Sequence, residues 1–157
     1  MSIALHGVAA GKGIAIGHAH LITRGTTEVP QYDIDPDKLD AEVARFDNAI
    51  KATRKELEQL RGAIPENAPT ELGAFISLHL MLLTDVTLSR EPIDILREQK
   101  INAEWALKQQ SDKLAAQFDS IDDDYLRERK QDMLQVVRRI HNNLVGQSNE
   151  INLAGNL

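Results

Sequence analysis

Residues 35–62 read DPDKLDAEVARFDNAIKATRKELEQLRG, and this stretch decides the fold. Its apolar side chains recur at steps near three, four and seven, which is the period of one face of an α-helix. Asp35 is placed to cap this helix, Pro36 suits its first position, and Gly62 follows its last residue. The apolar stripe consists of Leu39, Val43, Phe46, Ile50, Leu57 and Leu60. A long amphipathic helix therefore begins a mainly helical domain.

Three more segments with helical period follow. The second helix begins near Thr70, and its pattern falters over residues 84–89, where we expect a kink. Asn102 can cap the third helix. The aspartates at 122–124 can cap the fourth, and Gly146 can end it. Four amphipathic segments joined by short loops predict a mainly α fold, an antiparallel four-helix bundle of two helical hairpins with the second helix kinked.

Composition and charge narrow the class of protein. The 157 residues are 42% hydrophobic and carry a net charge of −6, which is typical of a globular protein and argues against a general nucleic-acid binder. The chain has no cysteine, which excludes disulfides, thiol catalysis and thiolate zinc sites and fits a cytoplasmic location. The most apolar stretch, residues 76–83, is far shorter than the ~20 residues that a membrane span needs.

The two ends of the chain differ from its helical middle. Residues 1–30 contain β-compatible Ile and Leu side chains interrupted by glycines, which predicts a short N-terminal β segment. The GVAAGKG run at 7–13 lacks the spacing and the final Ser or Thr of a phosphate loop, so we interpret it as a tight turn. We therefore divide the chain into a β segment (1–30), a helical domain (31–146) and a linker (147–157).

The run LHLMLL at 78–83 is apolar almost all the way round a helix. A helix in a small bundle has a wet side, so this one is either unusually buried or exposes a docking face. Met81 beside Leu82 is typical of adaptable binding surfaces, although the residues alone slightly favour the core. No nucleophile, base and orienting group occur at motif spacing, and no metal-ligand pattern is complete. These residues indicate a helical binding module with no catalytic or metal site.

Four stretches together resemble the N-terminal part of Enzyme I, the phosphoenolpyruvate–protein phosphotransferase family of the bacterial sugar phosphotransferase system. GKGIAIG at 11–17 resembles the family's SPGIAxG, and EVARF at 42–46 resembles its EVERF. HLMLLTD at 79–85 resembles HxMLLxD, and DDYLRER at 123–129 resembles DDEYLKER. The four stretches occur in the family's order and span nearly the whole chain.

The resemblance implies a function for the helical domain. In the family, a helical subdomain of two hairpins binds the small carrier protein HPr, and an α/β subdomain carries the phospho-accepting histidine in a GGxTSHxAI segment. None of the five histidines here lies in such a segment, so we expect this chain alone to be inactive and its β segment to belong to an incomplete α/β subdomain. The resemblance also implies that phosphoenolpyruvate and magnesium bind a later barrel domain, and that the parent protein is a homodimer. The chain itself is expected to hold no cofactor.

The resemblance assigns the HPr-facing positions residue by residue. They are Glu71, His79, Met81, Leu82, Asp85, Leu88, Leu126 and Arg129. Family members often carry further acids beside the aspartate, whereas this chain has Thr84, Val86 and Thr87 there, so we expect weaker electrostatic steering of a basic partner.

Three alternatives remain open: the nitrogen-regulatory paralogue, a dihydroxyacetone-kinase phosphotransfer subunit, and a stand-alone helical adaptor. A start at Met1, just ahead of the first strand, favours the sugar-system form, because the paralogues usually carry extra domains ahead of this one.

Overall fold

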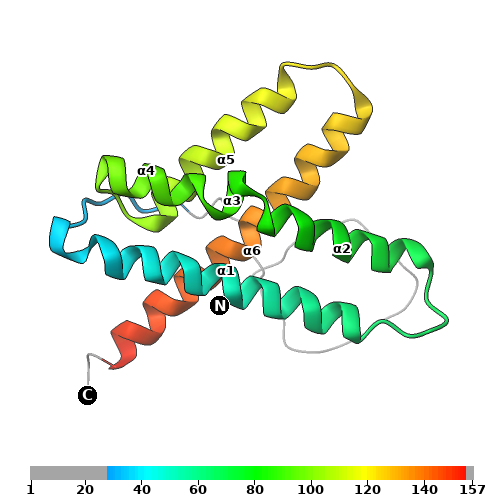
Figure 1. Ribbon diagram of the computed structural model, residues 1–157, viewed down its shortest axis with the longest axis horizontal. Helices are drawn as coiled ribbons and strands as arrows, with labels where there is room; N and C mark the ends of the chain where they lie inside the picture. Colours follow the sequence, from blue (N-terminus) through cyan, green and yellow to red (C-terminus); the bar gives the residue numbers. More distant parts are fainter. Residues whose placement is uncertain (1–27, 155–157) are drawn as a thin grey trace, which may run out of the picture.

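The computed structural model describes residues 28–154, and the side chains of residues 28–146. It is mainly helical, and Figure 1 shows two long helical hairpins that cross each other, with two short helices between them. Contacts between α1 and α6 hold the hairpins together, and α4 packs against α5. The elements are η1 (Pro36–Lys38), α1 (Leu39–Gly62), α2 (Thr70–Thr84), α3 (Val86–Ser89), α4 (Glu91–Gln99), α5 (Ala103–Asp119) and α6 (Asp124–Ala154).

The predicted β segment lies almost entirely in residues 1–27, outside the described residues. Within the described part of the chain, the β structure amounts to one isolated antiparallel bridge between Asp33 and Ile101. The backbone around this bridge is held by two further hydrogen bonds, from Ile34 N to Lys100 O (2.8 Å) and from Asn102 N to Tyr32 O (3.1 Å). The segment ahead of α1 is therefore fixed to the turn between α4 and α5.

Helix α1 forms as predicted, but both of its ends differ from the prediction. Pro36 begins a 3₁₀ turn that leads into the α-helix, and the Asp35 side chain forms no capping hydrogen bond. Gly62 is the last helical residue, and the helix ends at Ala63 in the right-handed region. The predicted stripe is also one residue too long, because Leu60 is exposed near the end of the helix.

The kink predicted for the second helix is confirmed. Helix α2 ends at Thr84, Asp85 adopts an extended conformation, and the two stretches on either side, Thr70–Thr84 and Val86–Gln99, are bent by 58°. The Asp85 carboxylate accepts a hydrogen bond from Thr87 N (2.9 Å) and so begins α3. Among the described residues no single helix is long and apolar enough to cross a membrane, although this bent pair together has the length and composition.

The second hairpin begins where predicted. Asn102 occupies the N-cap position of α5, but its side chain does not cap the helix: its Oδ1 accepts from Tyr32 N (3.0 Å) and its Nδ2 donates to Pro30 O (2.9 Å). Asp123 does cap α6, since its carboxylate accepts from Tyr125 N (2.8 Å). The prediction that Gly146 ends α6 is wrong, because the helix continues through it to Ala154.

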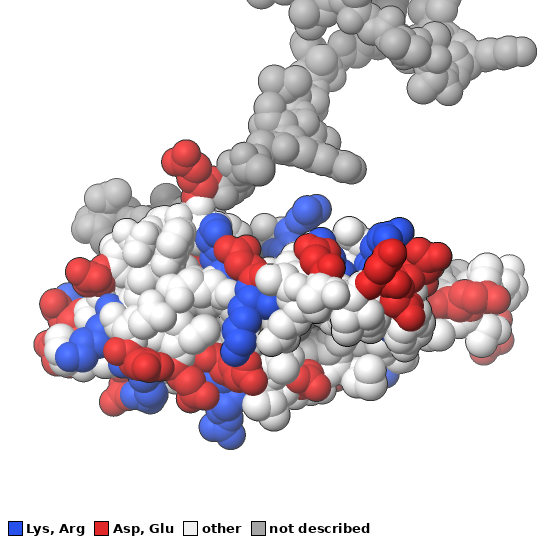
Figure 2. Space-filling view, turned by 90° about the horizontal axis from the view of Figure 1, so that it is seen from above, with Lys and Arg blue, Asp and Glu red and all other residues white. Residues whose placement is uncertain are grey.

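The core is aliphatic and lies where the two hairpins cross. Its largest fully buried apolar side chains come from α1, α2, α3, α4, α5 and α6. They are Phe46, Leu57, Leu83, Leu88, Leu96, Leu107, Val136, Ile140 and Leu144. Figure 2 shows the molecule from above, and basic and acidic side chains are interspersed on this face. The distribution of charge therefore does not single out one region of this face as a docking site.

Candidate functional site

One face of α2 carries a stripe of side chains outside the core. Glu71, Phe75, Leu78, Leu82 and Asp85 follow one another at steps of three or four residues, so they share this face of the helix. Phe75 is 42% exposed, although aromatic side chains of this size are usually covered. Met81 lies at the edge of the stripe. It is 61% exposed, which makes it one of the most exposed large apolar side chains described here.

His79 connects this stripe to α6. Its ring is only 2% exposed and lies against the Phe75 ring, with centroids 4.1 Å apart. Its Nε2 lies 3.4 Å from Asp132 Oδ1 on α6. The Asp132 carboxylate also accepts from Arg129 Nη1, at 3.3 Å. His79 is therefore a buried connection between the two helices, covered by Phe75 on α2 and facing Asp132 on α6.

The first turns of α6 supply the other side of the site. Tyr125 is 60% exposed, and the Arg129 guanidinium lies over its ring, 4.7 Å from the ring centre. Tyr125, Arg129 and Asp132 are spaced by four and three residues, so they lie on one face of α6. The α2 stripe with Met81 and these α6 residues with Leu126 together form what we call the α2–α6 surface.

Asp85 is held charged at the end of the α2 stripe. Its backbone hydrogen bond from Thr87 N and the bond from the Thr87 hydroxyl (2.7 Å) lower the pKa of this carboxyl below its ordinary value. The carboxylate is exposed, so it retains acceptor capacity toward an incoming donor. The α2–α6 surface therefore combines exposed apolar side chains with a fixed anion, Asp85, at the end of α2 and a positioned cation, Arg129, on α6.

The predicted positions do not all lie on this surface. Glu71, Met81 and Asp85 are exposed, and Leu82, Leu126 and Arg129 are half-buried. Leu88, in α3, is only 1% exposed and belongs to the core cluster. Six of the eight predicted residues thus remain available for direct contact, while His79 and Leu88 are buried.

The prediction missed three residues that form the site. Phe75 and Tyr125 provide its exposed aromatic rings, and Asp132 joins His79 to Arg129. Sequence spacing could have indicated Phe75, which precedes His79 by one helical turn. The pairing of His79 with Asp132 depends on how α6 crosses α2, which no local pattern encodes.

The described residues contain no group of three or more His, Asp or Glu side chains that could hold a metal ion. The α2–α6 surface has no nucleophile paired with a base, since its one histidine is covered and faces a carboxylate that also binds an arginine. Its chemistry is that of a surface that binds another molecule through apolar contact, with charged side chains beside the apolar ones.

Comparison with known sequences places this arrangement in a family. The family model "PEP-utilising enzyme, N-terminal" matches residues 6–129. Two curated relatives are named phosphoenolpyruvate-protein phosphotransferase. The one from Cupriavidus necator is 49% identical over 146 residues, covering 93% of this chain and 25% of the relative. The one from Bacillus subtilis is 34% identical over 146 residues, covering 90% of this chain and 25% of the relative.

A solved structure shares the fold. The solution structure of an Enzyme I protein, nEIt, matches with a TM-score of 0.71 and 27% sequence identity, over 79% of this chain and 50% of that one. The chain spans about a quarter of the length of the curated relatives it matches. The similarity therefore concerns one segment of much longer proteins.

Proposed function

The chain belongs to the family of N-terminal domains of PEP-utilising enzymes, and we propose that it is the docking segment through which a phosphoenolpyruvate–protein phosphotransferase binds the carrier protein HPr. The α2–α6 surface is the contact region in this proposal. Its exposed Phe75, Met81 and Tyr125 carry the argument. Apolar side chains gathered beside a polar rim are typical of a surface that binds another protein.

The two charges give the docking its orientation. Arg129 is positioned by Tyr125 and Asp132, and Asp85 by Thr87, so neither charge has to be ordered when the partner binds. Thr84 and Val86 flank Asp85 in this chain and leave it without neighbouring acids. Binding should therefore depend mainly on apolar contact, with a modest response to salt.

The parent protein, in the same proposal, transfers phosphate from phosphoenolpyruvate through a histidine to HPr in the cytoplasm. The names of the curated relatives support the phosphotransferase reaction over the stand-alone adaptor. Phosphoenolpyruvate and magnesium would bind in other parts of that protein and not to the helical domain. The role of the segment described here is to hold HPr, and the chemistry of the transfer belongs to those other parts.

Substitution of the exposed Met81 and the half-buried Leu82 tests the docking proposal. Met81→Ala and Leu82→Ala should each weaken HPr binding by about 1–2 kcal/mol, measured by isothermal titration calorimetry, because anchor side chains contribute most of the affinity of an interface. The melting temperature of the Met81→Ala variant should not change, because the side chain it removes is exposed.

Leu60→Ala is the matched control, since Leu60 is an exposed leucine on α1 outside the α2–α6 surface. It should bind HPr as the unaltered chain does. Unchanged HPr affinity in both anchor variants, together with a marked fall in melting temperature, would show that these side chains are core and would refute the docking proposal.

A further inference from the structure

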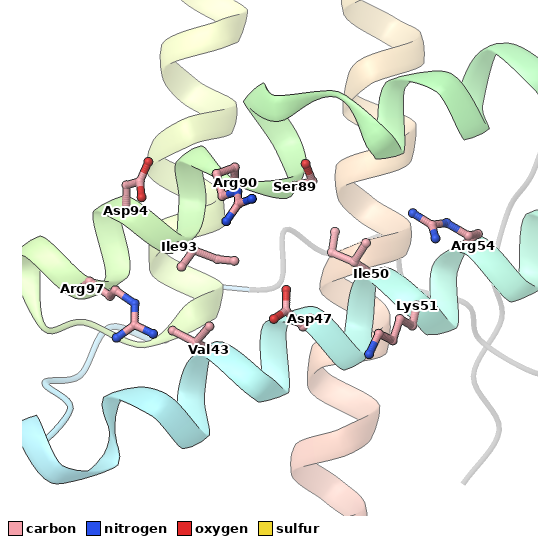
Figure 3. A pocket seen from close by; sticks show the side chains of 10 residues that line it. All are labelled: Val43, Asp47, Ile50, Lys51, Arg54, Ser89, Arg90, Ile93, Asp94 and Arg97. Atoms are coloured by element: carbon pink, nitrogen blue, oxygen red, sulfur yellow. The ribbon is translucent and has the colours of Figure 1, made fainter.

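A cavity of about 570 Å³ lies between α1 and α4 (Figure 3). This volume is within the range of small-molecule sites, roughly 300–1,000 Å³. Its lining includes the half-buried Val43 and Ile93, one from each helix, and the buried Ile50 beneath them. None of the predicted docking residues lines it. The cavity is therefore a second concave site, separate from the α2–α6 surface.

Basic side chains gather at this cavity although the whole chain has a net charge of −6. Lys51 and Arg54 come from α1, and Arg90 and Arg97 come from the α4 side. Arg97 is bound to Asp40 at 3.0 Å. The other three form no ion pair with any residue of the described part of the chain. Three cationic groups thus border one cavity without an anionic partner.

Two carboxylates, those of Asp47 and Asp94, also line the cavity, but they form no ion pair with its cations. In Figure 3 the Asp47 carboxylate points from α1 toward α4, and the Arg90 side chain points from α4 toward α1. Neither Asp47 nor Asp94 lies within 4.0 Å of a basic group in the described residues. Opposite charges that face one cavity without meeting leave room for a ligand that contacts both.

We propose that this cavity binds a small phosphomonoester whose carbon skeleton carries free hydroxyl groups. Arg54 and Arg90 fit the phosphate, because a guanidinium donates two parallel hydrogen bonds to phosphate oxygens. Asp47 accepts hydrogen bonds from hydroxyls, since an ionised carboxylate is an acceptor only. The apolar side chains that line the cavity, Val43, Ile50 and Ile93, contact the carbon skeleton.

Titration of the full chain with glycerol 3-phosphate, followed by amide NMR shifts, tests the proposal. Amides of α1 and α4 at the cavity should shift, and Arg54→Gln and Arg90→Gln should each weaken binding about tenfold, the usual effect of losing a charge-assisted hydrogen bond. Arg61→Gln is the matched control, since Arg61 is an exposed arginine of α1 outside the cavity. It should leave binding unchanged at equal ionic strength.

Two comparisons separate a specific site from general attraction of anions. Asp47→Asn should lower the affinity for glycerol 3-phosphate relative to that for inorganic phosphate, because it removes the acceptor of the hydroxyl groups as well as an anion that repels both ligands. If inorganic phosphate binds as tightly as glycerol 3-phosphate, or if Arg61→Gln weakens binding as much as Arg90→Gln, the proposal is overturned. Arg54 and Arg90 are exposed, so the two Arg→Gln variants should keep the helical circular dichroism of the original chain. If one of the two variants unfolds, the binding affinity of the other variant tests the proposal.

Discussion

Arg45 connects three helices of the described part of the chain through its polar contacts. Its guanidinium donates to Glu104 Oε2 at 2.7 Å and also to Glu42, and it donates to the backbone oxygen of Leu144 at 3.1 Å. One side chain of α1 therefore binds α5 and α6 together. Asn102 extends this cluster, because its Nδ2 donates to Glu104 Oε2 at 2.9 Å. The crossing of the two hairpins thus depends on a buried ion pair as well as on the aliphatic core.

Glu104→Gln should lower the free energy of unfolding by about 2 kcal/mol at pH 7, because a buried charge-assisted hydrogen bond is lost. Burial by itself would raise the pKa of Glu104, but hydrogen bonds from Arg45 and Asn102 outweigh it and hold the pKa below its usual value. The stabilisation is therefore complete above the pKa of the unfolded state, about 4.3, and is lost as the pH falls through the lower pKa of the folded state.

Urea unfolding of both proteins between pH 7 and pH 3 measures this effect, and the difference between them should shrink at the acidic end. Asp40→Asn is the control, because the Asp40–Arg97 pair is exposed and such pairs contribute at most about 1 kcal/mol. A Glu104→Gln variant as stable as Asp40→Asn at pH 7 would contradict the structural role of the buried pair.

Helix α6 differs most from its predicted extent. Gly146 lies inside the helix, is exposed, and a Cβ at this position would meet nothing within 4 Å. Gly146→Ala should therefore stabilise the protein by about 0.5–1 kcal/mol, because alanine loses less backbone entropy in a helix. Differential scanning calorimetry should show a rise in melting temperature of about 1–4 °C.

Gly73→Ala in α2 is the matched comparison, since a Cβ there also meets nothing within 4 Å. It should stabilise the protein by a similar amount. A destabilised Gly146→Ala variant would indicate that the helix ends at Gly146, as the sequence suggests.

The elements that the sequence predicts correctly are those specified by local patterns. The apolar period of α1, the break between α2 and α3, and the aspartate cap of α6 each depend on neighbours a few residues away. The predictions for Gly146 and Asn102 are wrong because, at these two positions, packing and distant partners outweigh the local signal. A glycine signal is overridden when a helix has packing on the preceding turns, and Asn102 is used by the distant Tyr32 and Pro30.

The candidate site divides in the same way. Its α2 residues could be predicted because they share one helical face, and its Phe75 lies on that face too. The burial of His79 and Leu88 could not be predicted from local spacing, because it depends on how α5 and α6, which are distant in the sequence, pack against these residues. The sequence therefore predicts which helix carries the site, and the crossing of the hairpins determines which of its residues remain exposed.

At the scale of the whole molecule, His141 should make stability depend on pH near neutrality. Burial lowers the pKa of His141, with an opposing effect from the charge of Glu104, and its Nε2 finds no partner among the described residues. The unfolded chain takes up the proton first as the pH falls below about 6.5, so the free energy of unfolding decreases until the folded-state pKa is reached.

A His141→Gln variant should lack this part of the pH dependence. Chemical unfolding between pH 8 and pH 5 should show that the stability difference between the original chain and the variant declines toward the acidic end. Parallel curves for the two proteins over this range would show that His141 is equally easy to protonate in the folded and unfolded states.

Helix α6 spans 31 residues against 17 for its partner α5, so it extends well beyond the hairpin, as Figure 1 shows. At 1.5 Å per residue it is a rod of about 46 Å. One end of this rod carries Tyr125 and Arg129 of the α2–α6 surface, and α1 crosses it further along. A tilt of α6 by about 10° about this crossing would move one end of the helix by about 8 Å relative to the other. A partner that changed the packing of the first turns of α6 would therefore displace the far end of the helix by an amount that grows with its distance from the crossing.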